Sequence, residues 1–216
     1  MTREFDGEIF HTPGVHMIRL GYLSPLNGGY NLTVVDQPGV TRRGFGLECK
    51  DYELLVSIDP TVVDREFSLD QKAILLTLAR ERAVTFIADV DDLADLDMVP
   101  IVRRPLYIAE MLDEGYRIRI GDVDAEPVAE SDLADASFVV SEYGARFVSL
   151  MDGLRTVGEI VTAVEAAALA NPRDREAIAV GEKKTGQTFH SYLMAESFTF
   201  IKVLANSGAT TFEPRA

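Results

Sequence analysis

Residues 141–160 constrain the fold most, because they carry local signals for two short helices joined by a tight turn. Apolar side chains at positions i, i+3 and i+4 predict a first amphipathic helix, and these are Phe147, Leu150 and Met151. The dipeptide Asp152-Gly153 is expected to end that helix, since glycine adopts the left-handed conformation without a Cβ clash. Thr156 stands three residues before Glu159, which is the spacing of a capping box at the start of a second helix.

The segments around this helix pair extend the pattern. Residues 136–140 are predicted to form a strand, and residues 192–204 a third helix that ends at Asn206-Ser207-Gly208. A strand, two helices joined by a turn, a later helix and a final hairpin follow one another in a winged-helix unit. The sequence therefore predicts an α+β fold with a winged-helix-like unit in its second half.

The first 60 residues read as β-rich. Three strand-like segments, 15–20, 30–35 and 52–58, are separated by turns rich in glycine and proline, among them Asn27-Gly28-Gly29. None of these glycines forms a phosphate-binding loop, because no GxGxxG or GxxxxGK[ST] pattern leads into a helix.

The middle of the chain suggests an internal repeat. Ser68 and Gln71 have capping-box spacing before an apolar stripe, residues 106–112 look helical, and residues 116–120 look like a strand. Shifting the chain by 73 residues aligns Ser68 with Ser141 and several apolar positions with one another. We therefore hypothesise a degenerate tandem repeat, in which residues 1–122 hold a β-rich region and a first winged-helix-like unit, and residues 123–216 hold the second unit.

The charge distribution argues against nucleic acid as a partner. The formal net charge is −14, with 13 basic and 21 acidic side chains in residues 1–122, and 8 and 14 in residues 123–216. Both halves would repel a phosphate backbone, so a basic partner fits better.

Cysteine usage and hydropathy point to a cytoplasmic protein. Cys49 is the single cysteine and cannot form an internal disulfide. No run of about 18 apolar residues predicts a membrane span, and no secretory signal is visible at the N-terminus.

Catalytic and metal-binding patterns are not found. The histidines, His11, His16 and His190, are scattered, and no cysteine or carboxylate spacing completes a ligand set around them. The acidic segment 89–97 lacks the glycine and terminal glutamate of a calcium loop, so a solvated charged segment is favoured. The acidic segment 122–135 is interpreted as a linker or mobile loop. No serine elbow, Cys–His pair or HExxH motif occurs, so we expect no enzyme activity and no cofactor in this chain.

The run FVSLMDGLRTVGEI at residues 147–160 resembles the PqqD-type fold, and the likeness covers roughly residues 117–214. That family serves as the precursor-recognition element of pathways that modify ribosomally made peptides (RiPP biosynthesis). One departure is the segment 171–187, which is longer and more polar than the usual link to the third helix. The additional β-rich half is similar to the partner subunits of iron-dependent peptide-modifying oxidases, as in methanobactin-type and thiaglutamate-type pathways. The resemblance implies a non-catalytic subunit in a heterodimer, which captures the precursor peptide and delivers it to the metal-dependent partner enzyme.

The resemblance also implies a binding site. In the family, the leader segment of the precursor is added as a strand to the edge of the sheet and packs against the third helix. Carried over by position, the site consists of Phe138, Val139, Val140, Tyr192, Leu193, Glu196, Ser197 and Phe200. For each apolar member alone, such as Phe200, Leu193 or Val139, a place in the core of the unit is favoured, whereas Tyr192, Glu196 and Ser197 carry polar atoms suited to the rim of a groove. Phe138→Pro would test the site by removing a backbone donor.

Two other functions remain open at this stage. An acidic winged-helix regulator or protein–protein adaptor would bind DNA or a dedicated protein partner without a peptide. A small-molecule enzyme built on the β-rich first half would be active without a partner.

Overall fold

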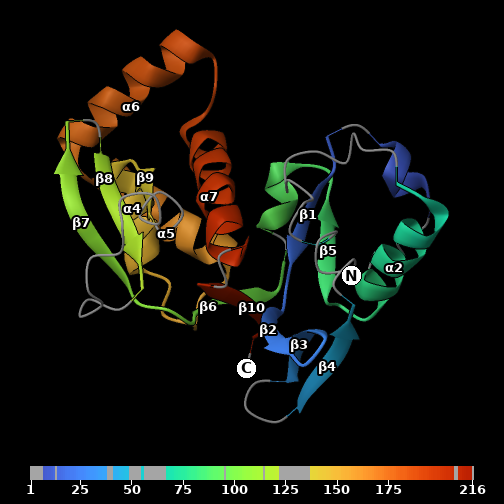
Figure 1. The fold of residues 1–216 in the computed structure, drawn as a ribbon. Coiled ribbons are helices and arrows are strands. Elements are labelled where there is room, and N and C mark those ends of the chain that lie inside the picture. Colours follow the sequence, from blue (N-terminus) through green and yellow to red (C-terminus); the bar gives the residue numbers. More distant parts are fainter. Residues whose placement is uncertain are drawn as a thin grey trace.

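Strands dominate the first half of the chain and helices the second, so the fold is α+β (Figure 1). The computed structural model describes residues 7–12, 14–37, 41–48, 55, 67–94, 96–113, 115–121, 137–206 and 209–215. The helical elements are η1 (Gly7–His11), α2 (Leu69–Arg80), η2 (Val90–Leu93), α4 (Glu142–Ser149), α5 (Val157–Ala170), α6 (Pro172–Thr185) and α7 (Phe189–Asn206). The strands are β1 (His16–Arg19), β2 (Tyr22–Leu26), β3 (Gly29–Gln37), β4 (Thr41–Leu47), β5 (Val84–Ile87), β6 (Met98–Val102), β7 (Leu106–Leu112), β8 (Gly115–Ile120), β9 (Ser137–Val140) and β10 (Thr210–Pro214).

The described strands form four small antiparallel sheets with the orders β1-β5, β10-β6, β2-β3-β4 and β7-β8-β9. The predicted turn at Asn27-Gly28 joins β2 to β3, where Gly28 has a φ of +87°. A φ in that region is readily adopted by glycine, which is why Asn-Gly is a common hairpin turn. Gly115 begins β8 with a φ of +146° and allows the close return of the chain from β7.

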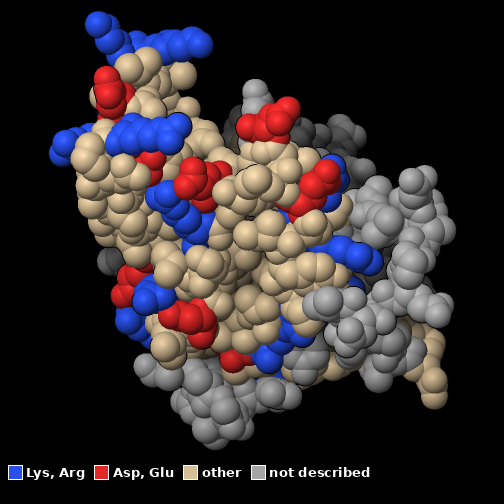
Figure 2. Space-filling view, turned by 90° about the vertical axis from the view of Figure 1, so that its left-hand side faces the viewer, with Lys and Arg blue, Asp and Glu red and all other residues tan. Residues whose placement is uncertain are grey.

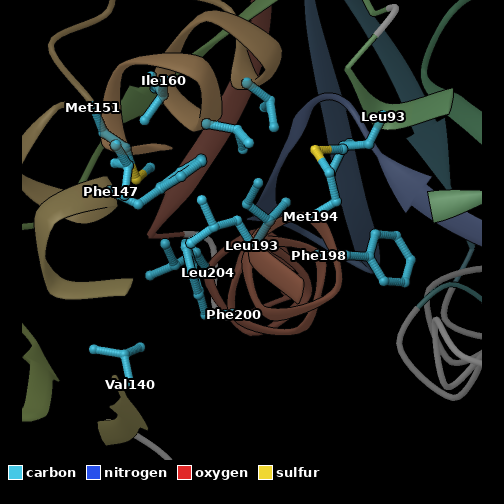
Figure 3. Close-up of a cluster of buried hydrophobic side chains, with 14 of the residues drawn as sticks. Leu93, Val140, Phe147, Met151, Ile160, Leu193, Met194, Phe198, Phe200 and Leu204 are labelled. Carbon is cyan, nitrogen blue, oxygen red and sulfur yellow. The ribbon is translucent and has the colours of Figure 1, made fainter. Parts of the chain in front are cut away.

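Helix α7 lies in the middle of the molecule, between the β7-β8-β9 sheet on one side and β1 and β5 on the other (Figure 1). Figure 3 shows its apolar side chains pointing both ways: Leu193, Phe200 and Leu204 face the side of Phe147 and Ile160, whereas Met194 lies toward Leu93. All of these residues belong to one buried cluster, which also includes Ile18 and Leu20 from the first half. Burial of apolar side chains on two of its faces stabilises this central helix, while Tyr192 and Val203 remain exposed.

A second apolar cluster holds the first half together. It packs α2 through Leu75 and Leu78 against β1, β3 and β5, and it includes Phe10. The ring of Phe10 makes edge-on contacts with Phe67 at 5.6 Å and with Phe86 at 5.9 Å between centroids. The predicted capping box of Ser68 and Gln71 starts α2.

Strand β10 joins the two halves. It pairs with β6 over its whole length, and the N–H of Phe212 donates to the carbonyl of Leu20 on its other side. Arg103 extends the contact, since its Nε donates to Thr211 Oγ1 at 2.9 Å and its guanidinium forms an ion pair with Glu213.

The tandem-repeat hypothesis is wrong. Residues 106–112, predicted to be helical, form strand β7, so the described residues between 68 and 115 hold one α-helix rather than a pair. The segment LYIAEML is rich in helix formers, but its pairing with β8 overrides that local preference.

The second half differs from the expected order of elements at two places. The polar segment 171–187 is mostly a helix, α6, which starts at the N-cap Asn171 with Pro172 in its first turn and ends at Gly186 with a φ of +73°. The expected hairpin after the third helix is a single strand, β10, whose partner β6 comes from far upstream. The predicted strand 52–58 lies outside the described residues except for Leu55, which is buried.

The helix pair, its turn and the strand before it match the predictions. Gly153 has a φ of +76°, and Thr156 and Glu159 form both bonds of the capping box. Helix α4 begins at an N-cap that was not predicted, Ser141. The boundary expected at residues 122/123 stays a prediction, but it falls between β8 and β9, which pair with each other. Among the described residues, every helix is too short or too polar to cross a lipid bilayer.

Candidate functional site

Strand β9 lies at an edge of the β7-β8-β9 sheet. Among the described strands it pairs with β8 alone, in the register Phe138 with Ile118 and Val140 with Tyr116. Helix α7 passes beside β9 and contacts it, and α4 follows directly from its end (Figure 1). An edge strand presents backbone N–H and C=O groups that can pair with another chain.

The geometry shows which backbone groups of β9 point away from β8. A Cβ placed on Gly115 would collide with the carbonyl oxygen of Val140, so this carbonyl points toward β8. The carbonyl of one residue and the N–H of the next point in opposite directions across a planar trans peptide. The N–H of Ser141 therefore points away from β8. By the alternation of an antiparallel strand, the N–H and C=O of Val139 also point outward.

The acceptor of the Ser141 N–H confirms this direction. Glu196 of α7 accepts it through Oε1 at 2.7 Å, and Oε2 accepts from Ser141 Oγ at 2.8 Å. The same serine hydroxyl accepts from the N–H groups of Tyr143 and Gly144, which makes it the N-cap of α4. One serine thus ends β9, starts α4 and ties both to α7.

Gly144 permits this close junction. A Cβ at that position would lie 2.7 Å from Cβ of Val140 and 2.8 Å from Oε1 of Glu196. Carbon atoms pack best at about 3.5–4.0 Å, so a larger residue would push α4 away from β9 and α7.

Tyr192 interacts with the carboxylate of Glu196 and belongs to a group of contacting aromatic rings. The rings of Phe189 and Tyr192 stack at 6.2 Å with an interplanar angle of 14°, and Tyr143 meets Phe189 edge-on at 4.9 Å. Burial raises the pKa of Tyr192. A hydrogen bond with Ser141 lowers it, whereas the negative charge of Glu196 and a hydrogen bond with its carboxylate raise it further. The phenol of Tyr192 therefore stays neutral and protonated at physiological pH.

The predicted site residues differ in exposure. Val139 is 53% exposed and Tyr192 is 39% exposed, so both are accessible beside the edge. Phe138 is half-buried, with its ring stacked on that of Phe200 at 6.3 Å. The buried members are Val140, Leu193, Ser197 and Phe200.

The exposed fractions separate the predicted site residues that belong to the core from those that do not. Leu193, Val140 and Phe200 fill the core, whereas Val139 does not. Ser197 is only 3% exposed, so the expectation that its hydroxyl lies at a rim is wrong. Glu196 is half-buried and already bonded to Ser141.

The outer surface around the sheet carries charges of both signs. Figure 2 shows blue and red side chains interspersed among uncharged ones on this side of the molecule. Arg117, opposite Val139 on β8, pairs with Glu110 at 3.1 Å, and Arg146 pairs with Glu142 and Asp174. Such an alternation offers no continuous surface for a phosphate backbone.

Two of the histidines have partners that the structure describes. His190 contacts Glu165 at 2.9 Å, and His16 packs against Phe198 at 4.6 Å between ring centroids. Among the residues that the structure describes, no group of three His, Cys, Asp or Glu side chains is placed to hold a metal ion.

Sequence reasoning missed Ser141 and Gly144. A serine followed by an amphipathic helix is a recognisable N-cap signal, so Ser141 could have been found as a cap. Its bond to Glu196, 55 residues away, has no sequence signal. The requirement for glycine at residue 144 depends on the same long-range packing. Comparison with protein-family models, curated proteins and solved structures finds no significant match to the chain.

Proposed function

We propose that this protein binds an extended peptide by strand addition at β9 and presents it to a separate modifying enzyme. The observation that carries the proposal is the outward-facing backbone of Val139 at a sheet edge next to α7. Backbone pairing of this kind supplies affinity for any extended segment, and the side chains beside the edge supply specificity.

The surroundings of the edge favour a peptide over a nucleic acid. Val139 and Tyr192 offer exposed apolar and aromatic surface, and the net charge of −14 disfavours polyanions. The sequence resemblance to PqqD-type recognition elements points to the same strand and helix. On that resemblance the peptide is the leader of a ribosomal precursor, and the partner is a metal-dependent, iron-using enzyme.

The test begins with panning of a displayed library of random 16-residue peptides against the full-length chain. Enriched peptides are then synthesised, and their affinity is measured by fluorescence anisotropy. Val139→Pro removes one outward N–H while leaving the pairing of β9 with β8 in place, because proline is tolerated where an edge N–H faces away from the sheet. Val139→Thr is the matched control, since it keeps the N–H and the β-branched shape.

We expect Val139→Pro to weaken binding by about 10- to 100-fold, the effect of one lost backbone bond and its unpaired acceptor. Val139→Thr should bind as the wild type does. Phe138→Pro is not a suitable test, because the N–H of Phe138 points toward β8 and the substitution would break the native sheet. Equal binding by the proline and threonine variants would refute the proposal, as would DNA binding without any peptide.

A further inference from the structure

The carboxylate of Glu196 stands at the end of the open edge of β9. It accepts two hydrogen bonds from Ser141 and is hydrogen-bonded to the phenol of Tyr192, all of them neutral groups. Glu196 forms no ion pair with any other residue that the structure describes. A carboxylate offers about four acceptor positions, so room remains for one further donor.

Tyr192 lies one helical turn before Glu196 on the same face of α7. Its ring is 39% exposed and is held in place by stacking on Phe189. The face of an aromatic ring attracts ammonium and guanidinium groups, and an adjacent carboxylate adds a charge-assisted hydrogen bond. A ring and a carboxylate side by side are therefore suited to a basic side chain.

We propose that Glu196 and Tyr192 bind a lysine or arginine side chain of the peptide that pairs with β9, and thereby set its register. This inference rests on the proposed function and adds a chemical class to its ligand. The Ser141 N–H already donates to Glu196. Val139 is therefore the last residue of β9 whose outward backbone groups can pair with an added strand. Strand residues rise by about 3.3 Å, so the basic residue lies about two positions beyond the one paired with Val139. The net charge of −14 favours such a ligand over an acidic one.

The test uses peptides obtained by panning against the wild-type chain, each synthesised with its basic residue intact or replaced by norleucine. Norleucine keeps the aliphatic stem and removes the charge. Glu196→Gln is the protein variant, because its amide oxygen can still accept from the Ser141 N–H and preserve the junction. Tyr192→Phe keeps the ring, and Tyr192→Leu removes it. Circular dichroism checks that each variant is folded.

We expect the wild type to bind the basic peptide about tenfold more tightly than the norleucine peptide, as one charge-assisted contact provides. Glu196→Gln should abolish this preference and leave the affinity for the norleucine peptide unchanged. Tyr192→Leu should reduce the preference, and Tyr192→Phe should retain it. The preference of the wild type should decline as salt is raised.

Failure of this inference differs from failure of the proposed function. The inference alone would be overturned if peptides depend on Val139 but Glu196→Gln still prefers the basic peptide over its norleucine form. It would also be overturned if the peptides that depend on Val139 contain no basic residue. Loss of any dependence on Val139 would overturn both.

Discussion

Replacing Gly144 by alanine tests the junction of β9, α4 and α7 directly. The new Cβ would lie 2.7 Å from Val140 Cβ and 2.8 Å from Glu196 Oε1. Relief requires either that α4 shift outward or that Glu196 rotate and release Ser141. Overpacking of this kind costs about 1–3 kcal/mol, and the gain in helix propensity offsets at most about 1 kcal/mol. We therefore expect the free energy of unfolding to fall by about 1–2 kcal/mol.

Gly181 in α6 provides the matched control, because a Cβ there would meet no atom within 4 Å. Gly181→Ala should raise the free energy of unfolding by about 0.5–1 kcal/mol. The assay is urea-induced unfolding followed by circular dichroism. The dependence of the free energy of unfolding on urea concentration is compared between variants. If Gly144→Ala stabilises the protein as much as Gly181→Ala does, the close approach of α4 to β9 and α7 is incorrect.

Two further predictions concern the turn and helix that follow α4. Thr156→Ala removes the acceptor of the Glu159 N–H and should lower the free energy of unfolding by about 1 kcal/mol in the same urea assay; an unchanged midpoint would argue against the capping box. The N–H of Leu154, with Arg155 nearby, holds the pKa of Asp152 below its usual value of 3.8. A depressed folded-state pKa means that the stabilisation by Asp152 is present above pH 3.8 and is lost as the pH falls through the folded pKa. Carbon-detected NMR titration of the Asp152 carboxyl measures this, and a midpoint at or above 3.8 would contradict it.

The sequence predicted best those parts of the fold whose signals are local. Caps, an Asp-Gly turn and apolar spacing predicted α4 and α5, because each signal acts within a few residues. The same kind of signal was present for α6, with Asn171 and Pro172 at its start and Gly186 at its end, but the polar composition of this segment concealed it.

Long-range pairing could not be predicted in the same way. Residues 106–112 are rich in helix formers, and only their pairing with β8 makes them a strand. At the site, the sequence indicated which strand and helix to consider. The direction of each β9 backbone group and the bond between Ser141 and Glu196 depend on register and tertiary contact.

The pairing of β6 with β10 has a consequence for synthesis of the protein. Arg103 and Thr211, which bond across this pair, are 108 residues apart, so the ribosome finishes β6 long before its partner strand. During that interval β6 lacks the partner that it has in the finished fold, and the two halves lack the bond between Phe212 and Leu20. Contacts of such high sequence separation form late and slow the folding of a nascent chain. A stop codon before residue 210 would therefore damage the first half of the protein as well as the second.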